Sequence, residues 1–144
     1  MKFEQATPFD LDAIKDLLAS YGLPANDIKG HLDNFIVAKE SNVLIGVGGW
    51  ESCKEVALLR SFAVNTSHKG LGIAEKILKL LEEQAVNSGV ESFYLLTDSA
   101  TNYFERFGYS GRSRENAPES IRKTKQFREL CSHTATMMYK DLCA

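Results

Sequence analysis

The chain has 144 residues, of which 44% are hydrophobic and 25% charged, and its formal net charge is −2. This length and composition predict one domain over residues 1–144 that buries a core. The basic residues do not cluster into the stripe that nucleic-acid binding needs, which excludes nucleic acid as a partner. No apolar run approaches the ~20 residues of a membrane span, so we expect a cytoplasmic protein without membrane contact.

The cysteines and histidines are few and scattered. Cys53, Cys131 and Cys143 form no C-x-x-C pair, and the three histidines form no i, i+4 pair. This pattern is not typical of a disulfide framework or a zinc site. We therefore expect reduced thiols and no metal.

The first half of the chain predicts a strand, two helices and three further strands. Residues 2–7 alternate as a half-buried strand does, and Thr7-Pro8 is typical of a helix start. Apolar residues at helical spacing then run to Tyr21, and Gly22 with Pro24 ends that helix. The remaining predicted elements are a short helix over 28–35 and strands over 35–38, 43–50 and 56–64.

The second half alternates helices and strands. The longest predicted helix starts at Ile73 and ends near Asn87, with one apolar face over about four turns. The later predicted elements are a strand over 93–97, a helix over 100–107, an extended segment from Tyr109, a charged helix over 118–130 and a last strand over 134–139. Such interleaving predicts the α+β class, an α/β sandwich with helices on both faces of one sheet. An exposed edge strand in the tail would also allow a homodimer.

A glycine-rich loop separates the strand that ends at Val64 from the longest helix. Its sequence is Lys69-Gly70-Leu71-Gly72-Ile73-Ala74. Glycines let the backbone approach a pyrophosphate, and the N–H groups and dipole of the helix start favour an anion. The loop has neither the G-x-G-x-x-G of a dinucleotide site nor the G-K-[ST] of a P-loop. The sequence therefore predicts a phosphorylated cofactor of another kind.

The loop resembles the acetyl-CoA signature of the GNAT acetyltransferase superfamily. Lys69, Gly72 and Ala74 occupy its Arg/Gln, Gly and Gly/Ala positions, so Lys69 departs from the usual residue. The segment from Ala100 to Tyr109 resembles the second signature of the family, a short helix followed by a glycine between aromatic residues. The resemblance implies a GNAT fold with a mixed, mostly antiparallel sheet of six to seven strands.

The same resemblance implies where acetyl-CoA binds. In the family the fourth and fifth strands splay apart, and the cofactor pairs with the free backbone of the fourth. On this basis we expect the cofactor to contact Phe62, Ala63, Val64, Lys69, Gly70, Leu71, Gly72, Ile73, Ala74, Thr97, Asn102 and Phe104.

Further segments are similar to two groups within the family: acetyltransferases found with arsenic-resistance genes, and the acetyltransferase domain of N-acetylglutamate synthases. These segments are residues 95–100, 104–109 and 121–124, together with Phe127. The similarity implies transfer of an acetyl group to the amine of a small substrate, an amino acid or a glutamate-like analogue such as a phosphinate or an arsenical.

The proton donor for the departing thiolate is ambiguous. The tyrosine that many family members use aligns with Phe104, which has no proton to give. Tyr103, one residue earlier, lies about 100° away around a helix. The predicted catalytic candidates are therefore Tyr103 and Ser61, with Thr97 as a further hydroxyl, and a packing role for Tyr103 is the alternative.

Candidate base and substrate-binding residues lie around the fourth strand. Glu51 and Glu55 flank its entry, where either is a candidate base or a solvated loop residue. Arg60 lies within the apolar run 56–64 and must find a partner or face a cavity. A substrate carboxylate would suit its planar fork, and an internal salt bridge is the alternative.

Two other functions are compatible with the same residues. A non-catalytic acyl-CoA sensor would keep the glycine loop and could lose the acid, as Phe104 suggests. A binding module in which the loop only turns the chain would not bind coenzyme A.

Overall fold

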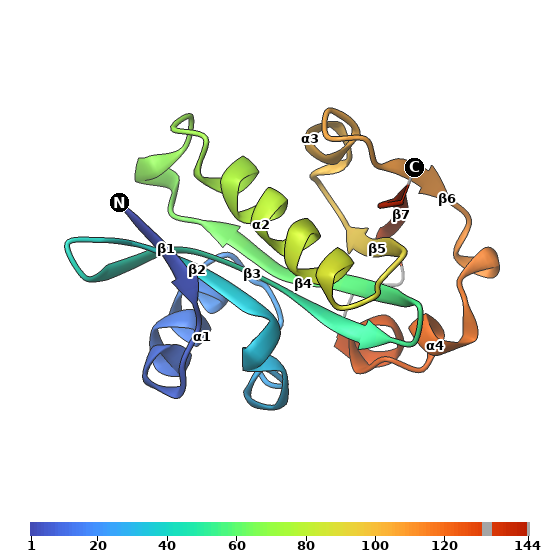
Figure 1. The fold of residues 1–144 in the computed structure, drawn as a ribbon, viewed down its shortest axis with the longest axis horizontal. Helices are drawn as coiled ribbons and strands as arrows, with labels where there is room; N and C mark the ends of the chain where they lie inside the picture. The colour runs from blue at the N-terminus through green and yellow to red at the C-terminus, as the bar shows by residue number, and fades with distance from the viewer. Residues whose placement is uncertain (131–133, 144) are drawn as a thin grey trace.

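The computed structural model describes residues 1–130 and 134–143, and its centre is a seven-stranded sheet (Figure 1). In sheet order the strands are β1 (Lys2–Gln5), β2 (Phe35–Glu40), β3 (Val43–Cys53), β4 (Val56–Val64), β5 (Ser92–Thr97), β7 (Thr136–Asp141) and β6 (Ser110–Arg112). Neighbouring strands are antiparallel except β4 and β5, which run parallel. The predicted fold class is confirmed.

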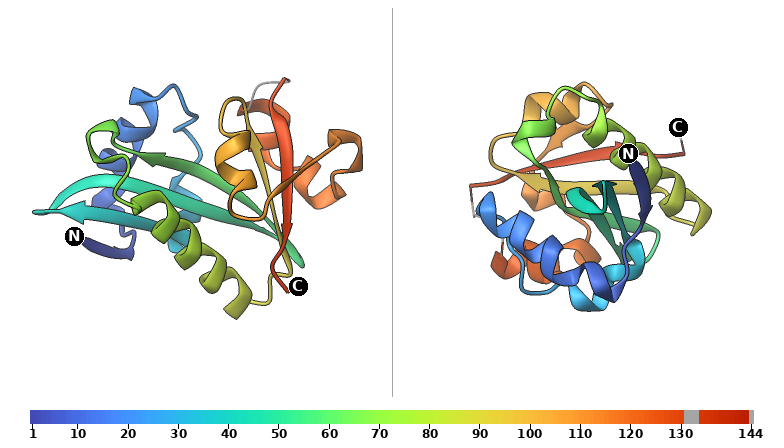
Figure 2. Two further views of the ribbon diagram at one scale, coloured as in Figure 1. Left: turned by 90° about the horizontal axis from the view of Figure 1, so that it is seen from above. Right: turned by 90° about the vertical axis from the view of Figure 1, so that its left-hand side faces the viewer.

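Helices cover both faces of this sheet, as the end-on view of Figure 2 shows. The α-helices are α1 (Leu11–Ser20), α2 (Ile73–Asn87), α3 (Thr101–Glu105) and α4 (Glu119–Arg122). Shorter 3-10 turns are η1 (Pro8–Asp10), η2 (Lys29–Asn34), η3 (Thr66–His68) and η4 (Arg114–Asn116), and η5 (Gln126–Leu130) is a π-helical turn. No helix among the described residues is both long and apolar enough to cross a bilayer.

Three apolar clusters join the helices to the sheet. On one face α2 buries Ile73, Ile77, Leu78, Leu81 and Ala85 against β2 to β5, as its periodicity predicts. On the other face the α1 residues Ile14, Leu17 and Leu18 pack beneath β2 and β3. A third cluster joins α4 to β4, β5 and β7. Two separate layers of helix therefore bury the sheet from both sides.

The strand β3 is longer than the apolar pattern predicts. It continues past Trp50 to Cys53, because Glu51, Ser52 and Cys53 pair with Leu58, Ala57 and Val56 of β4. Only Lys54 and Glu55 remain for the turn. The polar residues of this end are tolerated because Cys53 is buried with the third cluster and Glu51 finds a charged partner, described below.

The tail differs most from the prediction. The expected helix over 118–130 is wrong as a single element, because α4 ends at Arg122 and η5 begins at Gln126. Between them the Thr124 hydroxyl donates to the Ile121 carbonyl and accepts from the Phe127 amide, which closes one turn and starts the next. Ile121 is buried as expected; the side chain of Leu130 lies outside the described part.

The last strand is not at an edge of the sheet. β7 lies between β5 and β6, so the exposed edge on this side is the three-residue β6. The edge that could pair with a second copy on this side is thus β6 rather than the last strand, and the homodimer stays a prediction. The cysteines Cys53 and Cys143 are free thiols, and Cys131 lies outside the described residues. Burial, reinforced by the charge of Glu51, raises the pKa of Cys53 to about 11.

Candidate active site

The sheet opens between its two parallel strands. β4 and β5 pair over only three residues, and the last pair is Leu58 with Tyr94. Beyond that point β4 continues to Val64 and β5 to Thr97 without pairing to each other, and Figure 1 shows the two arrows diverging. Backbone groups on these facing edges thus lack the ladder partners that strands normally supply.

A bulge in β4 lies at the start of this opening. Val47 of β3 pairs with Ala63, but Gly49 pairs with Arg60, so β4 has one extra residue between the two pairs. Ser61 within the bulge has a φ of 55°, which is rare for a residue other than glycine. The bulge turns the β4 backbone where it leaves β5.

The predicted cofactor loop follows β4 and leads directly into α2. Gly70 and Gly72 have φ values of 84° and 75°, which explains why glycine stands at both positions. The first helical hydrogen bond of α2 runs from the Lys76 amide to the Gly72 carbonyl, so the amides of residues 73–75 precede it. No atom lies within 4 Å of where a Cβ would stand on either glycine. This arrangement leaves orphan N–H donors and open space at a helix start, which suits a pyrophosphate.

The loop is fixed by contacts at its entrance. The Asn65 side chain accepts hydrogen bonds from the amide and the hydroxyl of Ser67, and the Asn65 amide donates to the Ile45 carbonyl. The Tyr21 hydroxyl, at the end of α1, accepts from the Thr66 amide at 2.7 Å. Lys69 and Leu71 are exposed. The backbone of the cradle is thereby positioned without the Lys69 side chain.

The short helix α3 packs beside the opening. Phe104 is buried, and its ring meets those of Phe62, Tyr103 and Tyr109 edge to face. The Thr97 hydroxyl accepts from the Ala100 amide and so starts the turn into α3, while Asn102 is exposed. Phe104 thus fills the position of the usual acid with a packing side chain.

Tyr103 has a hydroxyl group without an assigned partner. Its Oη is buried and has no hydrogen-bond partner among the described residues. Burial raises the pKa of Tyr103, the charge of Arg106 opposes this effect, and Glu75 adds to it. The Tyr103 hydroxyl therefore keeps its proton at neutral pH.

Arg60 forms the centre of a charged cluster on the α1 face of the sheet. Its side chain is 1% exposed, and its guanidinium donates to the Asp27 carboxylate through both terminal nitrogens and to Glu51 Oε1 at 2.9 Å. Its Nε donates to the Ser61 hydroxyl at 3.1 Å. The alternative for Arg60, an internal salt bridge, is thus present, and the Arg60 side chain also contacts Ser61 of the bulge.

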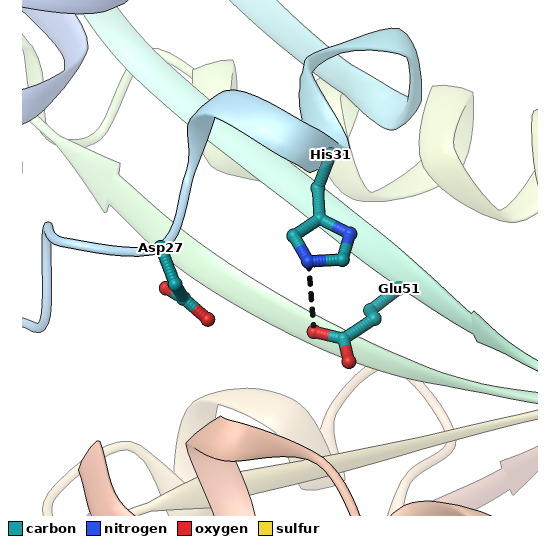
Figure 3. A group of neighbouring side chains, drawn as sticks. All are labelled: Asp27, His31 and Glu51. Atoms are coloured by element: carbon teal, nitrogen blue, oxygen red, sulfur yellow. Dashed lines mark ion pairs between the residues drawn. The ribbon is translucent and has the colours of Figure 1, made fainter.

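Three side chains that the sequence analysis did not single out complete this cluster: Asp27, His31 and Gln126. Gln126 Nε2 donates to Asp27 at 3.2 Å, and His31 Nε2 lies 3.6 Å from Glu51 Oε1 (Figure 3). Partial burial opposes ionisation of Asp27, but the hydrogen bond and charge of Arg60 outweigh it, so the pKa of Asp27 lies below its ordinary value. The only sequence signal for these partners was the need of Arg60 for a counter-charge.

Ligand atoms of Asp27, His31 and Glu51 lie within 4.8 Å of one another, a spacing that could hold a metal ion (Figure 3). However, both oxygens of Asp27 and one of Glu51 already accept from the guanidinium. A metal cation there would face the positive charge of Arg60, so the cluster is better described as an ion-pair network.

The two predicted glutamates have different places. Glu51 pairs across the sheet with Leu58, the last β4 residue before the opening, and its side chain joins the Arg60 cluster. Glu55 is exposed in the β3–β4 turn. It lies six positions before Ser61, which is about 20 Å along an extended strand. The structure thus brings Glu51, but not Glu55, beside Arg60 and Ser61.

Comparison with solved structures identifies similar folds at low sequence identity. The Mycobacterium tuberculosis protein Rv2747, in complex with CoA and a second ligand, is 20% identical with a TM-score of 0.83, over 98% of this chain and 99% of that one. The Neisseria gonorrhoeae N-acetylglutamate synthase, complexed with coenzyme A and N-acetyl-glutamate, is 18% identical with a TM-score of 0.84. That match covers 98% of this chain and 35% of the synthase.

A third similar structure is a GNAT acetyltransferase of Staphylococcus aureus Mu50, with 16% identity and a TM-score of 0.79 over 98% of both chains. At such identities these matches establish the fold. The family is identified from the sequence, because the sequence model of the acetyltransferase (GNAT) family matches residues 4–109. The chain belongs to the GNAT family of acetyltransferases.

Proposed function

We propose that the protein is an acetyl-CoA-dependent N-acetyltransferase that acetylates the amine of a small acceptor, an amino acid or a glutamate-like analogue. The observation that carries the proposal is the parting of β4 and β5 after Leu58, directly before the glycine-lined start of α2. A nucleotide-bearing thioester fits this place, since the opening offers free strand edges and the helix start offers amide donors. Similar structures were solved in complex with coenzyme A, which supports a cofactor of this kind.

The cofactor-binding residues of this proposal fall into two groups. The amides of residues 73–75 and the glycines Gly70 and Gly72 would hold the pyrophosphate, and the β4 backbone from Phe62 to Val64 would hold the pantetheine arm. When bound, acetyl-CoA supplies an acetyl group activated as a thioester. The chain itself then contributes binding, orientation and proton transfer.

The acceptor would approach from the α1 face, where Arg60 and Glu51 lie beside the opening. Glu51 Oε1 accepts from Arg60, while no partner of Oε2 is identified among the described residues. We assign Glu51 the role of taking the proton from the acceptor ammonium, since a neutral amine is the nucleophile. The N-acetyl-glutamate bound by the Neisseria synthase supports an acceptor of this class.

We propose Tyr103 as the acid, because its buried hydroxyl retains its proton and has no identified acceptor. If Tyr103 gives this proton during turnover, Tyr103→Phe should lower kcat by about 10²-fold or more. Stability should stay close to wild type, since the substitution removes an unpaired buried hydroxyl. Steady-state kinetics and a melting curve measure both, with Tyr139→Phe as a control tyrosine outside α3. Wild-type turnover of Tyr103→Phe would remove Tyr103 from the mechanism.

The function is tested by two assays on the same protein. Coenzyme A should raise the melting temperature in a concentration-dependent way, and acetyl-CoA with a panel of amino acids and simple amines should release free thiol. The absence of any thermal shift would contradict the proposal.

The second candidate, a non-catalytic acyl-CoA sensor, is favoured by one observation: Phe104 occupies the usual acid position as a packed aromatic residue. A thermal shift without thiol release across the panel would select the sensor over the enzyme.

A further inference from the structure

The Arg60 guanidinium already holds a carboxylate in the manner of a bound ligand. One terminal nitrogen donates to Asp27 Oδ2 at 2.9 Å and the other to Asp27 Oδ1. This two-pronged contact is the geometry in which arginine recognises a free carboxylate. The terminal nitrogens thus face Asp27 rather than an open pocket.

Arg60 does not depend on Asp27 for its position. Its Nε donates to Ser61 on β4, its NH1 also donates to Glu51 on β3, and its guanidinium lies 5.7 Å from the centre of the Phe35 ring. All three partners belong to strands of the sheet. The guanidinium would therefore keep its place if Asp27 moved away.

Asp27 has a different kind of support. It lies in the segment between α1 and η2, residues 21–28, which contains turns and bends but no helix or strand. Its other side-chain hydrogen bond comes from Gln126 in η5. A segment without its own backbone ladder can move at lower cost than a strand.

The charges of the cluster also permit an exchange. Two carboxylates, Asp27 and Glu51, share one guanidinium. His31 lies 3.6 Å from Glu51, and the Cys53 thiol is close enough to Glu51 for that charge to raise the pKa of the thiol. If Asp27 left the fork, Glu51 would still partly neutralise Arg60. An incoming carboxylate in its place would keep the charge balance of the cluster, and the released Asp27 would lie near the ammonium of the same acceptor.

From these contacts we infer that Asp27 is an internal stand-in for the acceptor's carboxylate, which must displace it from Arg60 in order to bind. This inference rests on the proposed function and adds a specificity-determining residue to it. Asp27 then sets the affinity for carboxylate-bearing acceptors, because an acceptor carboxylate can bind only while Asp27 is away from the Arg60 guanidinium. Amines without a carboxylate do not compete with Asp27 and escape this cost.

The test removes the charge of Asp27 and compares two kinds of acceptor. Asp27→Asn should lower KM for L-glutamate on the order of tenfold, as expected if Asp27 fills the fork about nine-tenths of the time, and should change kcat much less. It should leave KM for an alkylamine without a carboxylate unchanged. Isothermal titration of N-acetyl-L-glutamate into the protein with coenzyme A should show the same gain in affinity.

Matched variants separate this role from a structural one. Asp33→Asn removes one exposed charge from η2 and should change neither KM. Asp27→Glu keeps the charge and should return KM toward wild type. Asp27→Ser is a second neutral variant with the same expectation as Asp27→Asn, so the test does not depend on the folding of one substitution, and melting curves monitor each protein.

Several results would overturn the inference: an unchanged or raised KM for L-glutamate in the neutral variants, equal changes for both acceptors, or no carboxylate binding by either wild type or variants. Coenzyme A binding is measured in the same proteins. If coenzyme A binds and one of these results is found, only the role of Asp27 is overturned. If coenzyme A does not bind to the wild-type protein, the proposed function is overturned.

Discussion

The cofactor side and the acceptor side of the opening are built in different ways. The cofactor side is a continuous segment, β4 to α2, in which backbone amides and two left-handed glycines form the cradle. The acceptor side is a network of side chains that has Arg60 at its centre and comes from five segments: β3, β4, η2, η5 and residues 21–28. The cofactor side should tolerate changes of side chain but not of backbone conformation. The acceptor side should be more sensitive to changes of side chain than to changes of backbone conformation. Three substitutions test this contrast.

The largest effect is expected at Arg60. Arg60→Ala would leave the Asp27 and Glu51 carboxylates without their guanidinium in a largely buried place, which should lower the free energy of unfolding by about 3–5 kcal/mol. Chemical denaturation measures this loss. Lys79→Ala, which breaks an exposed pair with Glu75, is the control and should cost well under ~1 kcal/mol.

A further variant decides whether the loss is electrostatic. Adding Asp27→Asn and Glu51→Gln to Arg60→Ala removes the unpaired charges and should recover part of the stability. If Arg60→Ala is as stable as wild type, the network is not the structural centre of the acceptor side.

An intermediate effect is expected at Gly72. Gly72→Ala forces a side chain into a left-handed conformation with φ of 75°, at a cost of about 1–2 kcal/mol. The new Cβ meets nothing in the chain and projects into open space at the start of α2, so coenzyme A binding should weaken on the order of tenfold. Gly30→Ala, also in open space but without a positive φ, is the matched control. Equal affinity of Gly72→Ala and wild type would contradict the placement of the pyrophosphate.

The smallest effect is expected at Lys69. Because the amides and the helix start form the cradle, Lys69→Ala should raise the Kd of coenzyme A by about fivefold at most, and the difference should shrink with added salt. The exposed Lys29 in η2 provides the control variant Lys29→Ala. A loss of more than about a hundredfold would show that the Lys69 charge, rather than the backbone, holds the cofactor.

Sequence patterns predicted the local parts of the molecule correctly. The apolar periodicity predicted α2 and its buried face, and β-branched runs predicted strands where β2 and β3 lie. The pattern failed where tertiary contacts replaced local ones. Pairing with β4 extended β3 beyond Trp50, and the Thr124 hydroxyl divided the tail helix.

For the site, the sequence by itself determined the glycine loop and the family, because positive φ and a helix start are properties of a short segment. It also required that Arg60 have a partner, since a buried guanidinium cannot remain unpaired. Only the tertiary structure decided that the partner is Asp27, 33 positions away. It also decided that Gln126, 99 positions from Asp27, donates a hydrogen bond to the same carboxylate. It likewise placed Glu51 rather than Glu55 at the cluster, because strand pairing sets which of two neighbouring acids faces Arg60.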